Sequence, residues 1–341
     1  MQFDQFTLAL LPVLGFSFAG FSLAMLATPI FTTLAYRYQW WRKQRATAVT
    51  GESAKVFAKL HAEKHKRHIP TMAGTIVLFA VILITSFANL SRNETWLPLA
   101  TLVLFGGLGF IDDLSNIMGF ANRSGGLKAK TQALALVGLS LIGAWWFYAK
   151  LGYSVLHVPA VGDFEIGWLY VPLFIAVVFS TAKSVSITDG LDGLAGGLLS
   201  IAFSCFAIIA FFSGLNALAI FCATIVGALL AYTWFNIYPA RFFMGQVGST
   251  ALGATLGVIA MLLNSVFVLP IIGFVFVLEA GSSAVQIFSK KVFHRKIFLS
   301  APLHHHLEAS GWPETKVTMR LWIIGAVVGM LGLLIGLIAR G

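Results

Sequence analysis

The sequence has few charged residues and almost no cysteine. Only 11% of its 341 residues are Asp, Glu, Lys or Arg, whereas 58% are hydrophobic. A soluble domain of this length cannot hide so much apolar surface from water, so the composition excludes one and predicts a polytopic integral membrane protein. The two cysteines, Cys205 and Cys222, both fall inside apolar runs, which excludes a disulfide framework.

Long apolar runs predict an all-α fold of about ten transmembrane helices, forming a single domain over residues 1–341. The first run is too long for a cleaved signal and lacks a basic leading region, so we expect it to be retained. No charge marks the boundary near Asn264, and nine helices are the alternative count. The runs cover residues 8–36, 69–90, 95–111, 131–149, 166–185, 193–213, 215–237, 247–265, 266–287 and 320–339.

Lysine and arginine predict the orientation of the helices. With ten spans and both termini on the outer side, 20 of the 23 basic residues face the cytoplasm, and only Arg92, Lys150 and Arg340 lie outside. Topology and attraction to anionic lipids explain this basic face. No basic helix accompanies a soluble fold, so nucleic acid is not an expected partner.

Aspartate is rare, and its distribution is the most informative feature of the chain. Four of the six aspartates form two pairs, Asp112 with Asp113 and Asp189 with Asp192, each just outside an apolar run. A carboxylate beside hydrocarbon is costly unless it has a partner or a cation. Two such pairs at one membrane surface indicate Mg²⁺ and a phosphate substrate.

Five polar segments interrupt the apolar pattern, and the predicted topology puts all of them on the cytoplasmic face. This favours one active site there, although helix ends, turns and aromatic membrane anchors explain individual segments as well. His304, His305 and His306 point in different directions on any regular element, so we expect phosphate contacts or proton transfer rather than zinc. Glu279 lies deep in a predicted helix, where we expect it to pair within the bundle. The segments are residues 64–74, 110–113, 184–197, 235–253 and 301–312.

In order, these segments read KxxxPTMxG, FxDD, TDGLDGLA, YPAxxFMGxVGS and PxHHHxExxGWPE. The series resembles the phospho-N-acetylmuramoyl-pentapeptide transferase family over residues 30–339. The resemblance implies ten transmembrane helices, a homodimer, Mg²⁺ dependence and the bacterial inner (cytoplasmic) membrane. It also implies a reaction in which phospho-MurNAc-pentapeptide moves from UDP-MurNAc-pentapeptide to undecaprenyl phosphate, giving lipid I and UMP.

The resemblance also implies residue roles. Asp112 is the candidate base for the lipid phosphate, Asp189 is the nucleophile if the reaction has two steps, and Phe243 stacks on uracil. One-step and two-step routes both stay open. The catalytic candidates are Asp112, Asp113, Asp189 and His304; the substrate-binding candidates are Lys66, Thr71, Lys128, Lys130, Lys183, Ser186, Asp192, Asn236, Phe243, His305 and His306; the metal-ligand candidates are Asp113, Asp189 and, more weakly, Gln246.

Four positions depart from the family pattern. Gln246 stands where the resemblance implies the magnesium-binding Asp. Lys183 and Ser186 stand where it implies asparagines. Gln132 stands where it implies a lysine, and Lys128 or Lys130 can take the role of that lysine. An amide oxygen lacks the charge that hard cations favour, so we expect reduced Mg²⁺ affinity. Lys183 can take over part of the metal's work by neutralising a diphosphate.

These departures leave several alternatives open. One is a sister enzyme that uses another UDP-N-acetylhexosamine. Others are a weakened, altered or inactive relative that retains only nucleotide binding. A transporter or flippase of lipid-linked phosphates is disfavoured, because alternating access calls for polar groups at mid-membrane.

Overall fold

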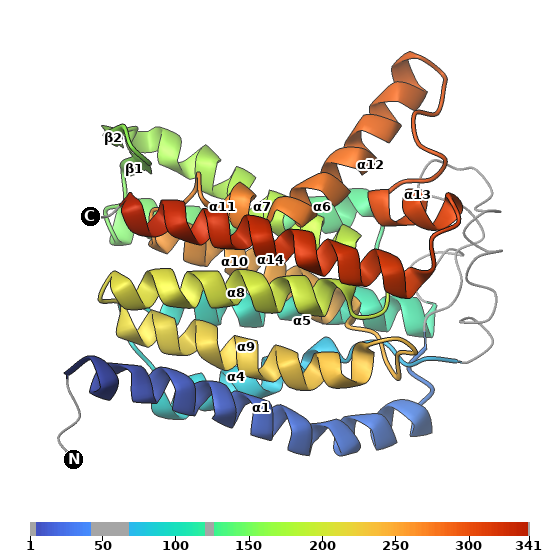
Figure 1. Cartoon of the computed structure of the whole chain (residues 1–341), viewed down its shortest axis with the longest axis horizontal. Helices are drawn as coiled ribbons and strands as arrows, with labels where there is room; N and C mark the ends of the chain where they lie inside the picture. The colour runs from blue at the N-terminus through green and yellow to red at the C-terminus, as the bar shows by residue number, and fades with distance from the viewer. Residues whose placement is uncertain (1–4, 42–67, 120–125, 340–341) are drawn as a thin grey trace.

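The computed structural model describes residues 5–41, 68–119 and 126–339. These residues are mostly helical, and the helices lie side by side in one bundle (Figure 1). Apolar segments favour helices in hydrocarbon because a helix satisfies its own backbone hydrogen bonds. The α-helices are α1 (Gln5–Arg37), α4 (Gly74–Ala88), α5 (Trp96–Met118), α6 (Ala129–Trp145), α7 (Tyr170–Thr188), α8 (Leu194–Phe212), α9 (Asn216–Asn236), α10 (Gly245–Leu262), α11 (Leu269–Ile272), α12 (Phe274–Val292), α13 (Leu303–Ala309) and α14 (Glu314–Ile338).

A helix occupies each of the ten predicted intervals, but in the described part of the chain eight helices are long and apolar enough to cross a membrane. Helix α4 has 15 residues, fewer than a full span needs. Helix α12 has 19 residues but carries Glu279, Lys290 and Lys291. The ninth interval is also divided at Gly273, where α11 ends and α12 begins.

The prediction of an all-α chain was wrong between α6 and α7. A one-turn π-helix (Trp146–Lys150) and a 3-10 turn (Gly167–Leu169) flank the strands β1 (Val155–Val158) and β2 (Gly162–Glu165), which pair antiparallel. Four-residue strands are too short to stand out in a pattern of long apolar runs. The Asn264 side chain, in the turn after α10, accepts a hydrogen bond from the His157 N–H at 3.0 Å and holds the hairpin there.

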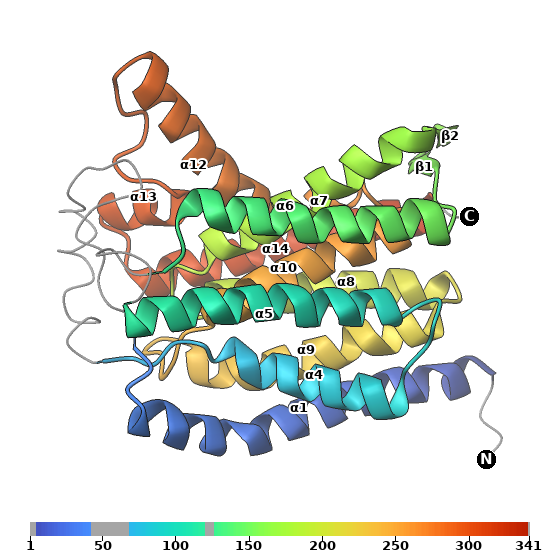
Figure 2. The ribbon, with the colours of Figure 1, turned by 180° about the vertical axis from the view of Figure 1, so that it is seen from behind.

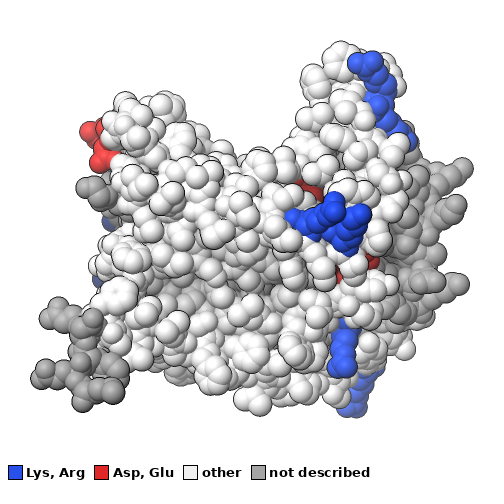
Figure 3. Space-filling view, in the orientation of Figure 1, with Lys and Arg blue, Asp and Glu red and all other residues white. Residues whose placement is uncertain are grey.

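The bundle has two chemically different ends. The start of α1, the end of α14 and the β-hairpin lie at one end, whereas α13 and the carboxyl end of α5 lie at the other (Figures 1 and 2). On the face shown in Figure 3, lysine and arginine gather mainly at the second end. The polar segments therefore share an end with basic side chains. The prediction that this end faces the cytoplasm remains a prediction.

Helix α10 is the centre of the bundle and sets the position of the polar end. Every one of its residues except Gln246 is buried. It packs against α4, α5 and α7 through close crossings. A Cβ atom at Gly109 of α5 would overlap the carbonyl oxygen of Gln246, and one at Gly74 would overlap Gly248. Small residues thus let the backbones approach closely, as is common between membrane helices.

Candidate active site

The five polar segments meet at the end of the bundle that carries the basic residues. Backbone pairing joins the first to the fourth: the Phe243 N–H donates to the Pro70 carbonyl at 2.8 Å, and the Ala73 N–H donates to the Phe243 carbonyl at 3.0 Å. Helix α4 begins only at Gly74, so Pro70 lies in a loop before the helix. Segments that are far apart in sequence therefore form one surface.

Asp112 and Asp113 lie inside a helix, because α5 continues to Met118 and the predicted end at residue 111 was wrong. They point to different sides. Asp112 Oδ1 accepts a hydrogen bond from the Leu127 N–H at 2.6 Å. Asp113 is fully buried, and its Oδ2 accepts one from the Val247 N–H at 3.0 Å. Asp113 therefore caps the amino end of α10, which has no capping side chain of its own.

Because of this cap, Asp113→Ala is expected to lower the free energy of unfolding by about 1–3 kcal/mol, the cost of leaving a buried N–H without a partner. Denaturant or thermal unfolding in detergent measures the change. Asp163→Ala is the matched control, since the Asp163 side chain is 66% exposed and its pairing with His157 contributes little. Equal stability of Asp113→Ala and the parent protein would contradict the capping role.

Asp189 and Asp192 do not share a helix face. Asp189 is the C-cap residue of α7, and Asp192 lies in the turn before α8. Asp192 is buried, and its Oδ2 accepts a hydrogen bond from the Ala240 N–H at 3.0 Å, while its own N–H donates to Glu314 Oε1 at 2.8 Å. Asp192 thus ties its own turn to the loop that contains Ala240 and to the start of α14. Asp189 is only partly buried and stands at the edge of the same turn.

Asn236 also braces loops. Its Oδ1 accepts a hydrogen bond from the Gly193 N–H at 3.0 Å, and its Nδ2 donates to the Phe242 carbonyl at 2.8 Å. Of the neighbouring phenylalanines, Phe242 is buried in the aromatic core and Phe243 is partly exposed. Only Phe243 can therefore offer a ring face to a ligand without unpacking the core.

The three histidines have three different partners. His304 Nδ1 lies 2.8 Å from Glu279 Oε2, and His305 Nδ1 lies 2.8 Å from Glu308 Oε2. His306 Nδ1 accepts a hydrogen bond from the N–H of Leu299. The prediction that Glu279 pairs within the bundle is confirmed.

His304 also supports the aspartate turn. Its side chain is completely buried, and its Nε2 has no hydrogen-bond partner among the described residues. That atom lies directly against Gly190, where an added Cβ would overlap it. Glycine at this position therefore allows the histidine to contact the backbone beside Asp189.

The four unusual residues form one hydrogen-bonded network. Gln246 Oε1 accepts from Ser186 Oγ at 2.8 Å, from Thr250 Oγ1 at 3.1 Å and from Gln132 Nε2 at 3.4 Å. Gln132 Oε1 in turn accepts from the Lys183 ammonium. Three helices, α6, α7 and α10, contribute to this network.

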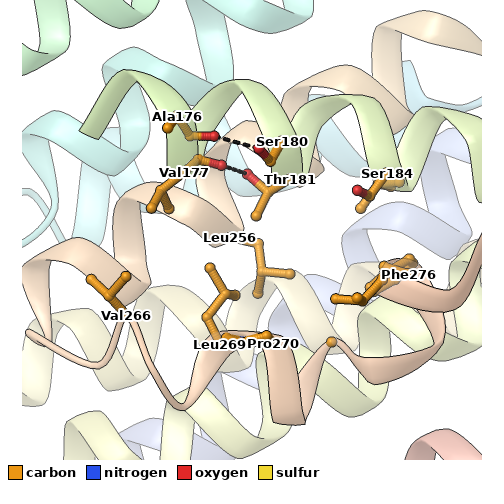
Figure 4. Close-up of a pocket in the computed structure, with 13 residues that line it drawn as sticks. Ala176, Val177, Ser180, Thr181, Ser184, Leu256, Val266, Leu269, Pro270 and Phe276 are labelled. Carbon is orange, nitrogen blue, oxygen red and sulfur yellow. Dashed lines mark hydrogen bonds between the residues drawn. The ribbon is translucent and has the colours of Figure 1, made fainter. Parts of the chain in front are cut away.

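An apolar cavity of about 280 Å³ lies between α7 and the α10–α12 region (Figure 4). The Ser180 and Thr181 hydroxyls donate to carbonyls of their own helix, those of Ala176 and Val177, so they leave the walls apolar. Ser184 lines one end of the cavity and is adjacent in sequence to Lys183. The sequence did not reveal this cavity, because its lining comes from separate apolar runs.

Comparison with known proteins agrees with this arrangement. The glycosyl transferase family 4 profile matches residues 95–264. Three phospho-N-acetylmuramoyl-pentapeptide-transferases are similar over most of their length. The protein of Desulfotalea psychrophila is 33% identical, and the match covers 96% of this chain and 93% of the relative. The protein of Oceanobacillus iheyensis is 36% identical, with 93% of this chain and 95% of the relative covered. The protein of Chloroflexus aurantiacus is 37% identical, with 79% of this chain and 77% of the relative covered.

The chain belongs to the phospho-N-acetylmuramoyl-pentapeptide-transferase family. The resemblance recognised in its motifs is confirmed. The remaining candidates of the family pattern differ in exposure. Lys128 and Lys130 are exposed at the start of α6, and Thr71 is buried with its Oγ1 unpartnered among the described residues. Lys66 lies outside the described residues.

Two of the three residues that the family pattern assigns to Mg²⁺, Gln246 and Asp113, suit the ion poorly in this chain. Mg²⁺ favours octahedral oxygen ligands that include carboxylates. The Gln246 oxygen is neutral and already accepts three hydrogen bonds, and one Asp113 oxygen caps α10. The described residues also contain no cluster of three or more His, Cys, Asp or Glu side chains suited to a metal.

Proposed function

We propose that this protein transfers phospho-MurNAc-pentapeptide from UDP-MurNAc-pentapeptide to undecaprenyl phosphate at the cytoplasmic face of the bacterial inner membrane, producing lipid I and UMP. The observation that carries this proposal is the convergence of the five motif segments at one end of an apolar bundle in a chain of this family. The homodimer implied by the resemblance remains a prediction.

The apolar cavity described above forms a groove between α7 and α12, and this groove suits the polyprenyl chain of the acceptor. Its walls are apolar, and Ser184 lies at one end, beside Lys183. An acceptor whose tail fills the groove would hold its phosphate near Lys183 and Asp112. The phosphate would then lie at the polar end of the bundle while the chain stays in hydrocarbon.

The donor would lie across the turn that contains Asp189. Phe243 would stack on uracil, Thr71 and Lys66 would contact the nucleotide, and Lys128 and Lys130 would attract the diphosphate from the rim. His305 and His306 would line the same cleft. Asp192 and Asn236 would act through the loops that they hold in place.

Two routes give the same products. In one step, an oxygen of the lipid phosphate attacks the sugar-linked phosphorus and breaks its bond to the UMP oxygen. In two steps, Asp189 attacks that phosphorus and releases UMP, and the lipid phosphate then displaces the aspartate. Both need alignment and charge neutralisation more than elaborate covalent chemistry. Gln246, a neutral amide at the position of the predicted Mg²⁺ ligand, suits that ion poorly.

Release of UMP by purified protein in detergent tests the proposal. If the reaction has one step, we expect UMP release only when UDP-MurNAc-pentapeptide and undecaprenyl phosphate are both supplied. If it has two steps, we expect at most one equivalent of UMP per protein molecule without the acceptor. Release with UDP-GlcNAc in place of the muramoyl donor would instead assign a sister transferase. Donor binding without release under any metal condition would contradict transferase activity.

A further inference from the structure

The neutral residue at the amino end of α10 is coupled to a nearby lysine. Gln246 is the only residue of α10 that is not buried, so its side chain is the part of that helix open to a ligand. Its oxygen is held by hydroxyl and amide donors, and the Gln132 amide links it to the Lys183 ammonium. The site thus has a cation joined to an amide where a carboxylate was expected.

Lys183 lies inside the apolar helix α7, where a charged side chain is costly without a counter-charge. Gln132 is its one hydrogen-bond partner among the described residues, and that bond uses one of three ammonium hydrogens. Two donors therefore remain for an anion, and the adjacent Ser184 lines the end of the apolar groove.

The amides at positions 132 and 246 suit a lysine that binds an anion. An amide oxygen can orient the ammonium without neutralising it. A carboxylate at position 246 would instead draw the positive charge toward α10, since opposite charges attract strongly where water is scarce. The two amides of Gln132 and Gln246 therefore leave the charge of Lys183 available to an anion.

We propose that Lys183 is the resident cation of this site: held by Gln132, whose amide donates in turn to Gln246, it binds the diphosphate of the nucleotide donor, so that donor binding and transfer need no divalent metal. This inference rests on the proposed function for the identity of the ligand. A lysine ammonium is a compact point charge with three donors, well suited to phosphate oxygens.

Binding of UDP and of uridine to the purified protein in EDTA, measured by calorimetry, tests the inference without turnover. We expect UDP to bind in EDTA. Lys183→Met should weaken UDP binding about 10- to 100-fold, the usual effect of losing a charged hydrogen bond, and leave uridine binding unchanged. Lys150→Met is the matched control, because that lysine is exposed at the other end of the bundle.

A second variant guards against a folding defect in the first. Gln246→Asp should weaken UDP binding in EDTA and regain it when Mg²⁺ is added, because the new carboxylate both pairs with Lys183 and offers a metal ligand. UDP binding that requires Mg²⁺ in the parent protein, or that is unchanged in Lys183→Met, would overturn the inference.

The transfer assay separates this inference from the proposed function. Transfer that proceeds in EDTA and falls in Lys183→Met supports both. Transfer that occurs only with Mg²⁺ and is insensitive to Lys183 overturns the inference and leaves the function standing. Metal-free UDP binding through Lys183 without transfer under any condition supports Lys183 as the cation that binds the diphosphate and rejects the transferase.

Discussion

Asp189→Asn is expected to lower kcat for UMP release by at least about 1,000-fold, the scale of loss when a charged group that acts on the transition state is removed. Asp112, Asp113 and Asp192 each accept a hydrogen bond from a backbone N–H and so help hold the structure. Asp189 lies partly exposed at the end of α7, against a turn that His304 supports. Asp112, Asp113 and Asp192 are buried, so the carboxylate of Asp189 is the one of the four most open to a substrate.

Asn has nearly the same shape as Asp, and the backbone bond from the residue 189 N–H to the Val185 carbonyl is kept. The melting temperature in detergent should therefore stay close to that of the parent protein, and UDP should still bind. Asp163→Asn, an exposed aspartate on the hairpin, serves as control. A variant that retains roughly a tenth or more of the parent kcat would show that Asp189 takes no part in the chemistry.

Gly109→Ala is expected to destabilise the protein by about 1–3 kcal/mol, the usual cost of overpacking, and to reduce transfer roughly 100-fold through misplacement of the site. A Cβ at this position would overlap the backbone carbonyl of Gln246, which cannot move aside as a flexible side chain would. Either α5 or the amino end of α10 must shift. Both carry proposed site residues, so stability and activity should fall together.

Gly107→Ala is a close control for this change. It lies on the same helix, and nothing surrounds the position at which its Cβ would be added. Alanine there should be neutral or stabilise α5 by about 0.5–1 kcal/mol, because it is the better helix former. Thermal unfolding and UMP release measured on both variants make the comparison. Equal stability and equal UMP release of the two variants would show that the α5–α10 crossing can accommodate an added methyl group without loss.

The sequence predicts the helices well because hydrocarbon leaves so few alternatives to them. It fails where partners distant in the chain decide the outcome. Asp112 and Asp113 resembled a helix end, because buried carboxylates are costly, yet α5 continues past them to Met118. The Val247 N–H, 134 positions away, offsets part of that cost, and no local pattern reveals it.

The same limit applies to the site. The motifs identify which segments carry polar groups, and the unusual residues were visible one by one. Their connection was not, because Gln132 and Gln246 are 114 positions apart in sequence. Which residue of a motif is structural and which is open to a ligand also cannot be read from the sequence alone. Phe242 and Phe243 are neighbours in sequence, but only the structure buries the first in the aromatic core and leaves the second partly exposed.

Helix α12 leans away from the rest of the bundle, and the cavity lies on its inner side (Figures 1 and 4). Its Val277 lines that cavity and is also 47% exposed at the surface. A lipid that enters here diffuses within the plane of the membrane and not through a three-dimensional volume. The encounter rate then depends on the mole fraction of acceptor within the bilayer, and the amount of acceptor per volume of cell has no direct influence. Dilution by other lipids would slow the protein as effectively as substrate depletion does for a soluble enzyme.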